Sequence, residues 1–182
     1  MTAFILFDDG RVEPASGLLF RHPVDWIACR NADEVAGALA RADAARRDGL
    51  HVAGWLAYEL GYALEPALTA LLPDTDGMPL LRLGLWPPPR RLVGDEIDAF
   101  LAGEGGGHYT LGEMSPSWDF AAYRAAFASV RDYIAAGDVY QVNLTFPLSF
   151  AFNGDSVSFY RDLRDRARAG HAALFTAPEE TV

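Results

Sequence analysis

The stretch that decides the fold is "YIAAGDVYQVNLTFPLSF", which runs from Tyr133 to Phe150. Its first residues end a helical pattern, and Gly137 with Asp138 is typical of a tight turn. From Tyr140 onward the pattern alternates with a period of two, which indicates a β-strand with one apolar face. The apolar members are Tyr140, Val142, Leu144, Phe146, Leu148 and Phe150. We therefore predict a strand over 139–150, with Tyr140, Val142 and Leu144 on its buried face.

The opposite face of this predicted strand carries Gln141, Asn143 and Thr145. All three side chains can form hydrogen bonds and none is charged. A strand face in water usually collects Lys, Glu and Arg as well, so this neutral row suits a polar cavity. A surface strand that happens to lack charge is an equally open interpretation.

Helical patterns flank the strand on both sides. The first covers 119–136, with Asp119 placed to cap its start and Gly137 placed to end it. Its apolar positions recur at steps of three and four: Phe120, Tyr123, Phe127, Val130 and Ile134. A second helix is predicted from about 156 to 169, followed by the start of a hairpin.

The N-terminal part mixes strand-like and helical patterns. Strands are predicted within 3–7, 25–29, 51–62 and 79–86, and a helix within 32–48 that ends at Gly49. The glycine-rich stretch 103–118 follows neither period, which is typical of a linker. We predict an α+β chain with a first domain over 1–102, a linker over 103–118 and a second domain that begins at 119 and is incomplete at 182. Because the last residues only begin an expected strand, we expect the chain to be part of a longer protein.

Composition excludes several classes of function. The chain has 182 residues and a formal charge of −10, which argues against nucleic-acid binding because that needs clustered Lys and Arg. We expect no membrane partner and a cytoplasmic location, since no segment has the length of a membrane span and the lone Cys29 cannot form an internal disulfide. The four histidines are scattered without carboxylates or cysteines at ligand spacing, so we predict no metal site. Cys29 is expected to be a buried, inert thiol.

Two quoted segments carry a resemblance to a known family. "YIAAGDVYQVNLTFPL" and "SFYRDLRDRARAGHAALF" resemble the opening of the chorismate-binding domain in the component I enzymes, aminodeoxychorismate synthase and anthranilate synthase. "GLLFRHP", "ADEVAGAL" and "HVAGWLAYELGYALEP" are similar to the N-terminal domain of the same enzymes. Within the family, "YQVNLT" looks more like aminodeoxychorismate synthase, where an asparagine follows the Gln-Val pair.

The resemblance implies a fold and a chemistry. The fold would be antiparallel sheets packed face to face with flanking helices, as in anthranilate synthase component I, truncated before the rest of the chorismate-binding domain. The activity would replace the C4 hydroxyl of chorismate with an amino group, using ammonia from a glutamine amidotransferase subunit and a magnesium ion. The ligands of that magnesium would lie beyond Val182, and the chain alone would be inactive and inclined to self-associate.

The resemblance also gives roles to particular residues. In related enzymes that add water to chorismate, the position matching Gln141 is a lysine that acts as general base. Gln141 would instead orient an amine nucleophile as a catalytic residue, with Asn143 and Thr145 in the substrate pocket. A glutamine that merely bridges strands is the alternative.

A possible effector pocket of the N-terminal domain is implied beside Leu18, Leu19, Phe20 and Arg21. The family usually has a serine where Arg21 stands, so tryptophan binding is in doubt here. The alternative is that these residues are strand core and that Arg21 points to water. Three functions stay open: an aminodeoxychorismate synthase, an anthranilate synthase, and a binding or interaction module without chemistry.

Overall fold

The computed structural model describes residues 3–75, 77–177 and 180–181. These residues divide into two compact units. Unit 1 contains the described residues up to Gly106 together with those from Ser156 onward, and unit 2 contains Gly107–Asp155. Unit 2 is therefore inserted between two parts of unit 1 along the chain.

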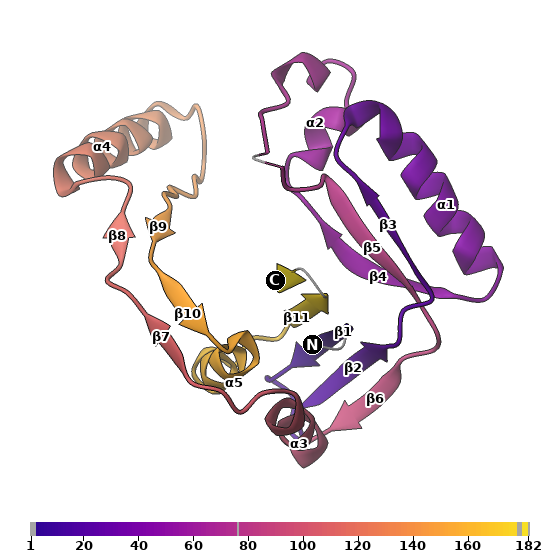
Figure 1. Cartoon of the computed structure of the whole chain (residues 1–182). Coiled ribbons are helices and arrows are strands. Elements are labelled where there is room, and N and C mark those ends of the chain that lie inside the picture. The colour runs from indigo at the N-terminus through magenta and orange to yellow at the C-terminus, as the bar shows by residue number, and fades with distance from the viewer. Residues whose placement is uncertain (1–2, 76, 178–179, 182) are drawn as a thin grey trace. The chain divides into compact units, whose positions relative to one another are not determined.

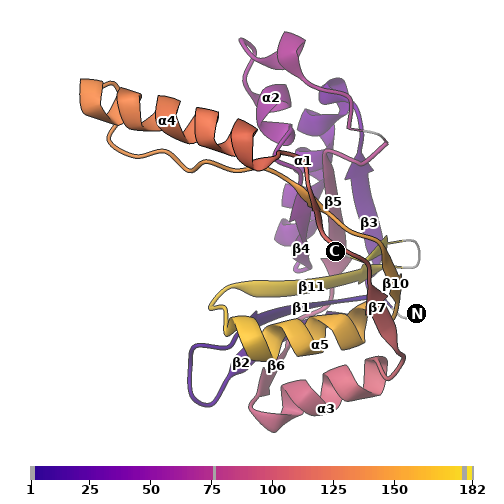
Figure 2. The ribbon, with the colours of Figure 1, turned by 90° about the vertical axis from the view of Figure 1, so that its left-hand side faces the viewer.

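Unit 1 holds an antiparallel five-stranded sheet, here called the large sheet. Its order is β12 (Glu180–Thr181), β11 (Ala172–Ala177), β1 (Phe4–Asp9), β2 (Ser16–Arg21) and β6 (Arg90–Val93). Helices α3 (Asp95–Glu104) and α5 (Ser156–Ala167) lie along one face of it (Figure 2). The core between sheet and helices consists of Phe4, Leu6, Leu19, Leu92, Ile97, Leu101, Val157 and Leu174.

A second sheet of three antiparallel strands completes unit 1. Its order is β3 (Asp25–Cys29), β5 (Leu81–Trp86) and β4 (His51–Leu56). Helix α1 (Val35–Arg47) runs along its outer face (Figure 1), and it buries Val35, Ala38, Ala42 and Ala45 there. The 3-10 turn η1 (Ala32–Glu34) precedes α1, and α2 (Leu60–Leu64) and the 3-10 turn η2 (Thr69–Leu71) follow β4. Gly49 has φ 88°, which fits its predicted place just after the helix.

The two sheets of unit 1 pack against each other through one apolar cluster. It is formed by Ile5, Phe20, Ala53, Trp86, Phe175 and Ala177. Aromatic rings meet across this interface, with 6.1 Å between the ring centroids of Phe20 and Trp86 and 5.7 Å between those of Trp26 and Phe175. The predicted α+β class with antiparallel sheets and flanking helices is therefore confirmed.

Unit 2 consists of one long helix and two short antiparallel ribbons. The ribbons pair β7 (Tyr109–Leu111) with β10 (Phe152–Gly154) and β8 (Ser115–Pro116) with β9 (Leu148–Ser149). Helix α4 (Phe120–Ala136) begins and ends as the sequence predicts. The Ala122 N–H donates to the Asp119 carboxylate at 2.8 Å, and Gly137 adopts the left-handed conformation with φ 81°.

The predicted strand over 139–150 is wrong for most of its length. Residues 141–147 form no strand, and only β9 at the end of the predicted range is paired. A strand needs a neighbouring backbone within about 5 Å, and the alternation of side chains cannot supply that neighbour. The predicted linker also contains regular structure, because α3 reaches Glu104 and β7 and β8 follow it.

The compact units do not follow the predicted boundaries at 102 and 118. Helix α5 and strand β11 pack with the N-terminal strands of the large sheet rather than with unit 2. Whether 119–182 begins a separate domain of a complete enzyme stays a prediction. Among the described residues, no helix combines the length and apolar character required to cross a membrane.

Candidate functional site

The neutral row of Gln141, Asn143 and Thr145 lies in the extended segment between α4 and β9. All three side chains are exposed, so each is accessible to a ligand. Within unit 2 the segment forms no ladder that would fix the three side chains relative to one another. The structure therefore makes the predicted substrate-pocket residues accessible without closing a pocket around them.

The burial of the alternate residues agrees with the predicted alternation in part. Phe146 is half-buried and stacks on Trp118 at 5.5 Å between ring centroids, with Tyr123 of α4 at 6.1 Å. Leu144 is also half-buried. Tyr140, however, is 94% exposed and Val142 is 41% exposed, so their predicted burial is wrong. Aromatic stacking holds the end of the segment, whereas its start has no sheet to pack on.

The predicted effector residues of the N-terminal domain divide between two faces of the large sheet. Leu19 joins the core under α3 and α5, and Arg21 is on the same face. Phe20 joins the cluster between the two sheets, and Leu18 shares its face. Because neighbouring residues of a strand point to opposite sides, these four side chains do not line one common pocket.

Arg21 is engaged within the protein rather than pointing freely to water. Its Nη2 donates to Glu104 at 2.8 Å, and its guanidinium lies 5.6 Å from the centre of the Phe100 ring. Both partners belong to α3. The ion pair and the cation–π contact tie the end of β2 to this helix.

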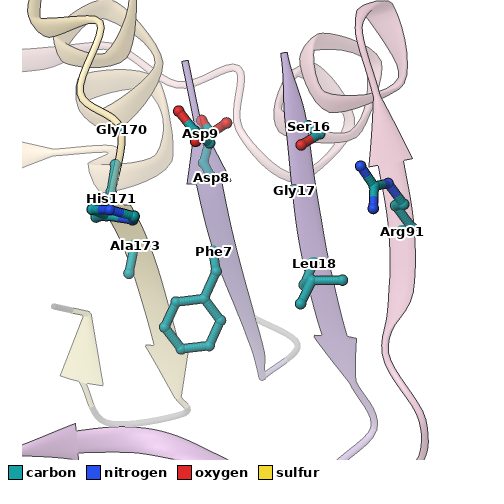
Figure 3. A pocket seen from close by; sticks show the side chains of 11 residues that line it. Phe7, Asp8, Asp9, Ser16, Gly17, Leu18, Arg91, Gly170, His171 and Ala173 are labelled. Carbon is teal, nitrogen blue, oxygen red and sulfur yellow. The ribbon is translucent and has the colours of Figure 1, made fainter. Parts of the chain in front are cut away.

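Leu18 lines an open hollow of about 490 Å³ on the same face of the large sheet as Phe20, over the part of that face that the second sheet does not cover (Figure 3). Its floor is apolar, since Phe7, Leu18 and Ala173 are cross-strand neighbours there. The polar rim is formed by Asp9, Ser16, Arg91 and His171. The backbone N–H and the guanidinium of Arg11 hold the pKa of Asp9 below its usual value, so that carboxylate is ionised at neutral pH. The hollow is chemically suited to a ligand that is apolar at its centre and carries polar substituents at its edge.

A buried ionic cluster lies beneath the other face of the large sheet, and the sequence analysis missed it. Asp8, with a side chain 1% exposed, accepts a hydrogen bond from Arg164 Nε, and Arg164 Nη1 donates to Asp98 at 2.8 Å. The Tyr160 hydroxyl donates to Asp8 at 3.4 Å. Burial, with the nearby Asp8 charge, raises the pKa of Tyr160 above its usual value, so this hydroxyl stays protonated. Nothing in the "FDDG" sequence signals a partner 156 positions away.

Metal and thiol chemistry receive no support from the described residues. Among them, no three His, Cys, Asp or Glu side chains lie together in a way that could hold a metal ion. Cys29 is buried as predicted, and desolvation, with a smaller effect of Glu34, raises the pKa of its thiol. A buried thiol with a raised pKa is poorly nucleophilic.

Comparison with protein families places part of the chain in a known family model. Residues 104–182 match the family model described as chorismate binding enzyme. The matched segment contains all of unit 2, with its neutral row at 141, 143 and 145, and also α5 and β11 of unit 1. A comparison with curated proteins gives no significant match. The family match supports a chorismate-utilising enzyme for this segment, whereas it does not distinguish one activity within the chorismate-binding enzymes from another.

Proposed function

We propose that this chain is the N-terminal portion of an aminodeoxychorismate synthase component I, which aminates chorismate to 4-amino-4-deoxychorismate for para-aminobenzoate and folate synthesis. The observation that carries the proposal is the family match over 104–182 together with "YQVNLT" inside it, where Asn143 follows the Gln-Val pair. The location would be the cytoplasm, and the ammonia would come from a glutamine amidotransferase subunit.

The chemistry assigned to Gln141 follows from its side-chain amide. In the amination, the lone pair of ammonia forms a C–N bond at C4 of chorismate, and the C4 hydroxyl leaves as water after it gains a proton. The amide oxygen of Gln141 accepts a hydrogen bond from an ammonia N–H and so orients the nucleophile. It does not remove a proton near neutral pH, and ammonia, unlike water, is already nucleophilic without that help.

Asn143 and Thr145 would extend the same hydrogen-bonding row toward the substrate. Their neutral side chains donate to the carboxylates or hydroxyl of chorismate without adding a like charge. Both are exposed in the described structure, so they are free to take up such contacts.

Magnesium enters this proposal only through the family resemblance. The described residues offer no cluster of carboxylates for the ion, the resemblance places its ligands beyond Val182, and no step here is routed through it. The residues of this chain would bind and orient the substrate and nucleophile.

The uncovered apolar stripe of α4 fits this proposal. Every residue of α4 is described and none is buried, and Phe120, Phe127 and Ile134 are 73%, 46% and 44% exposed. Apolar stripes of this kind are normally covered by another layer of structure. In the proposed enzyme, the remainder of the chorismate-binding domain would cover it.

The uncovered stripe leads to a prediction for the 182-residue chain by itself. We expect it to self-associate, because a second copy is the nearest available apolar surface. Light scattering after size exclusion should give a mass that rises with concentration. The variant Phe120→Glu, Phe127→Glu should lower that mass toward the monomer, and a monomeric wild-type chain at high concentration would contradict the prediction.

The test of function is an assay of product identity. The complete reading frame is expressed and supplied with chorismate, magnesium and ammonium chloride, and the products are separated by chromatography. We expect aminodeoxychorismate, which a separate lyase converts to para-aminobenzoate, and no product from the 182-residue chain alone. Formation of anthranilate would replace the proposal by the tryptophan-pathway alternative, and absence of both products from the complete protein would leave a binding module.

A further inference from the structure

Strand β1 lies inside the large sheet only because β11 covers one of its edges. The two strands pair antiparallel from Phe4 opposite Thr176 to Asp8 opposite Ala172. The N–H of Phe4 also donates to the Thr176 side-chain oxygen at 3.2 Å. The edge of β1 is thus filled by a segment that follows it by more than 160 positions.

Both faces of β11 and one face of α5 are buried in unit 1. Leu174 and Val157 enter the core beneath α3, at 3% and 0% exposure. Phe175 and Ala177 enter the cluster between the two sheets. The segment is therefore held both by backbone pairing with β1 and by two separate rows of buried side chains.

Arg164 adds a charge-specific contact to this fit. It is 11% exposed and joins Asp8 of β1 to Asp98 of α3, so one side chain of α5 bridges two elements of the N-terminal part. A buried carboxylate such as Asp8 is costly without a cationic partner, and Arg164 of α5 supplies one. The contact sets the register in which α5 and β11 dock.

We propose that the described residues up to Gly106 form a docking surface for the segment 156–177, and that this helix and strand bind there as a donor segment without needing a continuous chain through unit 2. The kind of partner that fits is an extended strand preceded by a helix that carries an arginine facing Asp8. Such strand addition takes its affinity from backbone hydrogen bonds and its specificity from alternate side chains. The inference does not depend on the proposed catalytic function.

The experiment uses the full chain with a protease recognition sequence inserted between Gly137 and Asp138. Both residues are exposed and lie in the turn after α4, so the insertion leaves unit 1 intact. Cleavage then gives 1–137 and 138–182 with all other residues present. We expect the two pieces to elute together in native buffer and to separate in urea, and separate elution in native buffer would overturn the proposal.

Contacts inside unit 2 could also hold the cleaved pieces together. Variants must therefore distinguish these contacts from the docking of 156–177 in unit 1. Phe146→Asp removes the stacking on Trp118 and Tyr123, and we expect the cleaved pieces to stay together. Arg164→Met should raise the dissociation constant of the cleaved pieces by roughly 10- to 100-fold, because it leaves Asp8 buried without its cation. Arg166→Met, at an exposed position of the same helix, is the matched control and should change it little.

Leu174→Asp is a stronger variant that places a charge in the core under α3. If it prevents folding, Arg164→Met still decides the question. Dissociation of the Phe146→Asp pieces with retention of the Arg164→Met pieces would assign the association to unit 2 and overturn the proposal. The opposite pattern supports it.

Discussion

Asp8 is a buried carboxylate that the fold stabilises through hydrogen bonds from neighbouring side chains. Its Oδ2 accepts from Arg164 and Tyr160, and its Oδ1 finds no hydrogen-bond donor among the described residues. A buried carboxylate oxygen without a donor has lost hydration that nothing replaces. The ion pair with Arg164 is therefore the main contact that holds the Asp8 carboxylate in place.

Two carboxylates of this cluster should differ sharply in their effect on stability. Asp8→Asn leaves Arg164 buried with one anion fewer, so we expect the free energy of unfolding to fall by about 2–4 kcal/mol. Asp98, whose side chain is 58% exposed, makes a solvated pair, and Asp98→Asn should cost about 0–1 kcal/mol. Urea titrations of both variants measure the difference. Equal losses would mean that burial does not govern this cluster.

Gln141 is the residue on which the proposed chemistry depends. In the complete enzyme, Gln141→Ala should slow amination because one orienting hydrogen bond is lost. The loss of transition-state stabilisation should be about 1–3 kcal/mol. Gln141→Lys introduces a general base and should divert part of the chorismate to a hydroxylated product. Product analysis with saturating ammonia measures both effects.

The control for Gln141 is Thr110→Ala, which changes an exposed neutral side chain of β7 in the same unit. It should aminate at the wild-type rate. If Gln141→Ala matches it, Gln141 does not face the substrate and the role proposed for the neutral row is wrong.

At the scale of single elements, the start of α1 depends on Glu34 of the preceding 3-10 turn. The carboxylate accepts from the backbone N–H of Arg30 at 3.0 Å and of Asn31 at 3.3 Å, and from the Asn31 side chain at 3.1 Å. The bond from Arg30, followed by those from Asn31, lowers the pKa of Glu34 below its ordinary value of 4.5. Its stabilising effect is thus complete above pH 4.5 and is lost as the pH falls through the lower folded value.

The variant Glu34→Gln replaces the carboxylate by an amide that does not titrate. The contribution of residue 34 to the free energy of unfolding should then be independent of pH. Wild type should be more stable than the variant at pH 6, and the difference should shrink as the pH falls below 4.5 and the wild-type carboxylate becomes protonated. Urea midpoints at several pH values measure it. Asp33→Asn, which changes the neighbouring exposed carboxylate, is the control and should keep a wild-type pH profile. A constant gap between wild type and Glu34→Gln would exclude the capping role.

The elements that the sequence predicts well are those whose signals are local. Helix α4 has its cap at Asp119, its period and its terminal Gly137 all within its own residues, and it forms as predicted. The strand over 139–150 has an equally clear period, but a strand also needs a partner that the period does not identify. The same reason explains why β11 was not expected beside β1, and why Asp8 and Arg164 were not expected to pair.

The predicted row of Gln141, Asn143 and Thr145 shows how much of the candidate site can be predicted from the sequence. Neutral polar residues at 141, 143 and 145 are visible in the sequence, and the family match covers them. Their accessibility is a property of the fold, and their role depends on the substrate contacts that no local pattern contains. Arg21 shows the converse, because its contacts with Glu104 and Phe100 arise only when α3 packs against β2.

At the scale of the whole molecule, unit 2 is an insertion whose two ends lie close together in unit 1. The N–H of Gly106 donates to the Ser158 side-chain oxygen at 3.2 Å, so the chain leaves and re-enters unit 1 at one place. The large sheet is incomplete without β11 and β12, which follow unit 2 in the sequence. Its stability should therefore depend on 156–177 and not on 107–155.

Replacing 107–155 by a linker of about three residues, which spans roughly 10 Å, should leave a folded unit 1. The shortened chain keeps the clusters under the helices and between the sheets, so we expect cooperative urea unfolding and a strand-rich circular dichroism spectrum. A chain that ends at Gly106 lacks β11 and α5 and leaves the edge of β1 unpaired, so it should be less stable than the shortened chain and prone to aggregate. Adding Arg164→Met to the shortened chain should lower its urea midpoint, since the Asp8 contact lies wholly in unit 1. A shortened chain that is no more stable than 1–106 would show that unit 2 is required for the sheet to form.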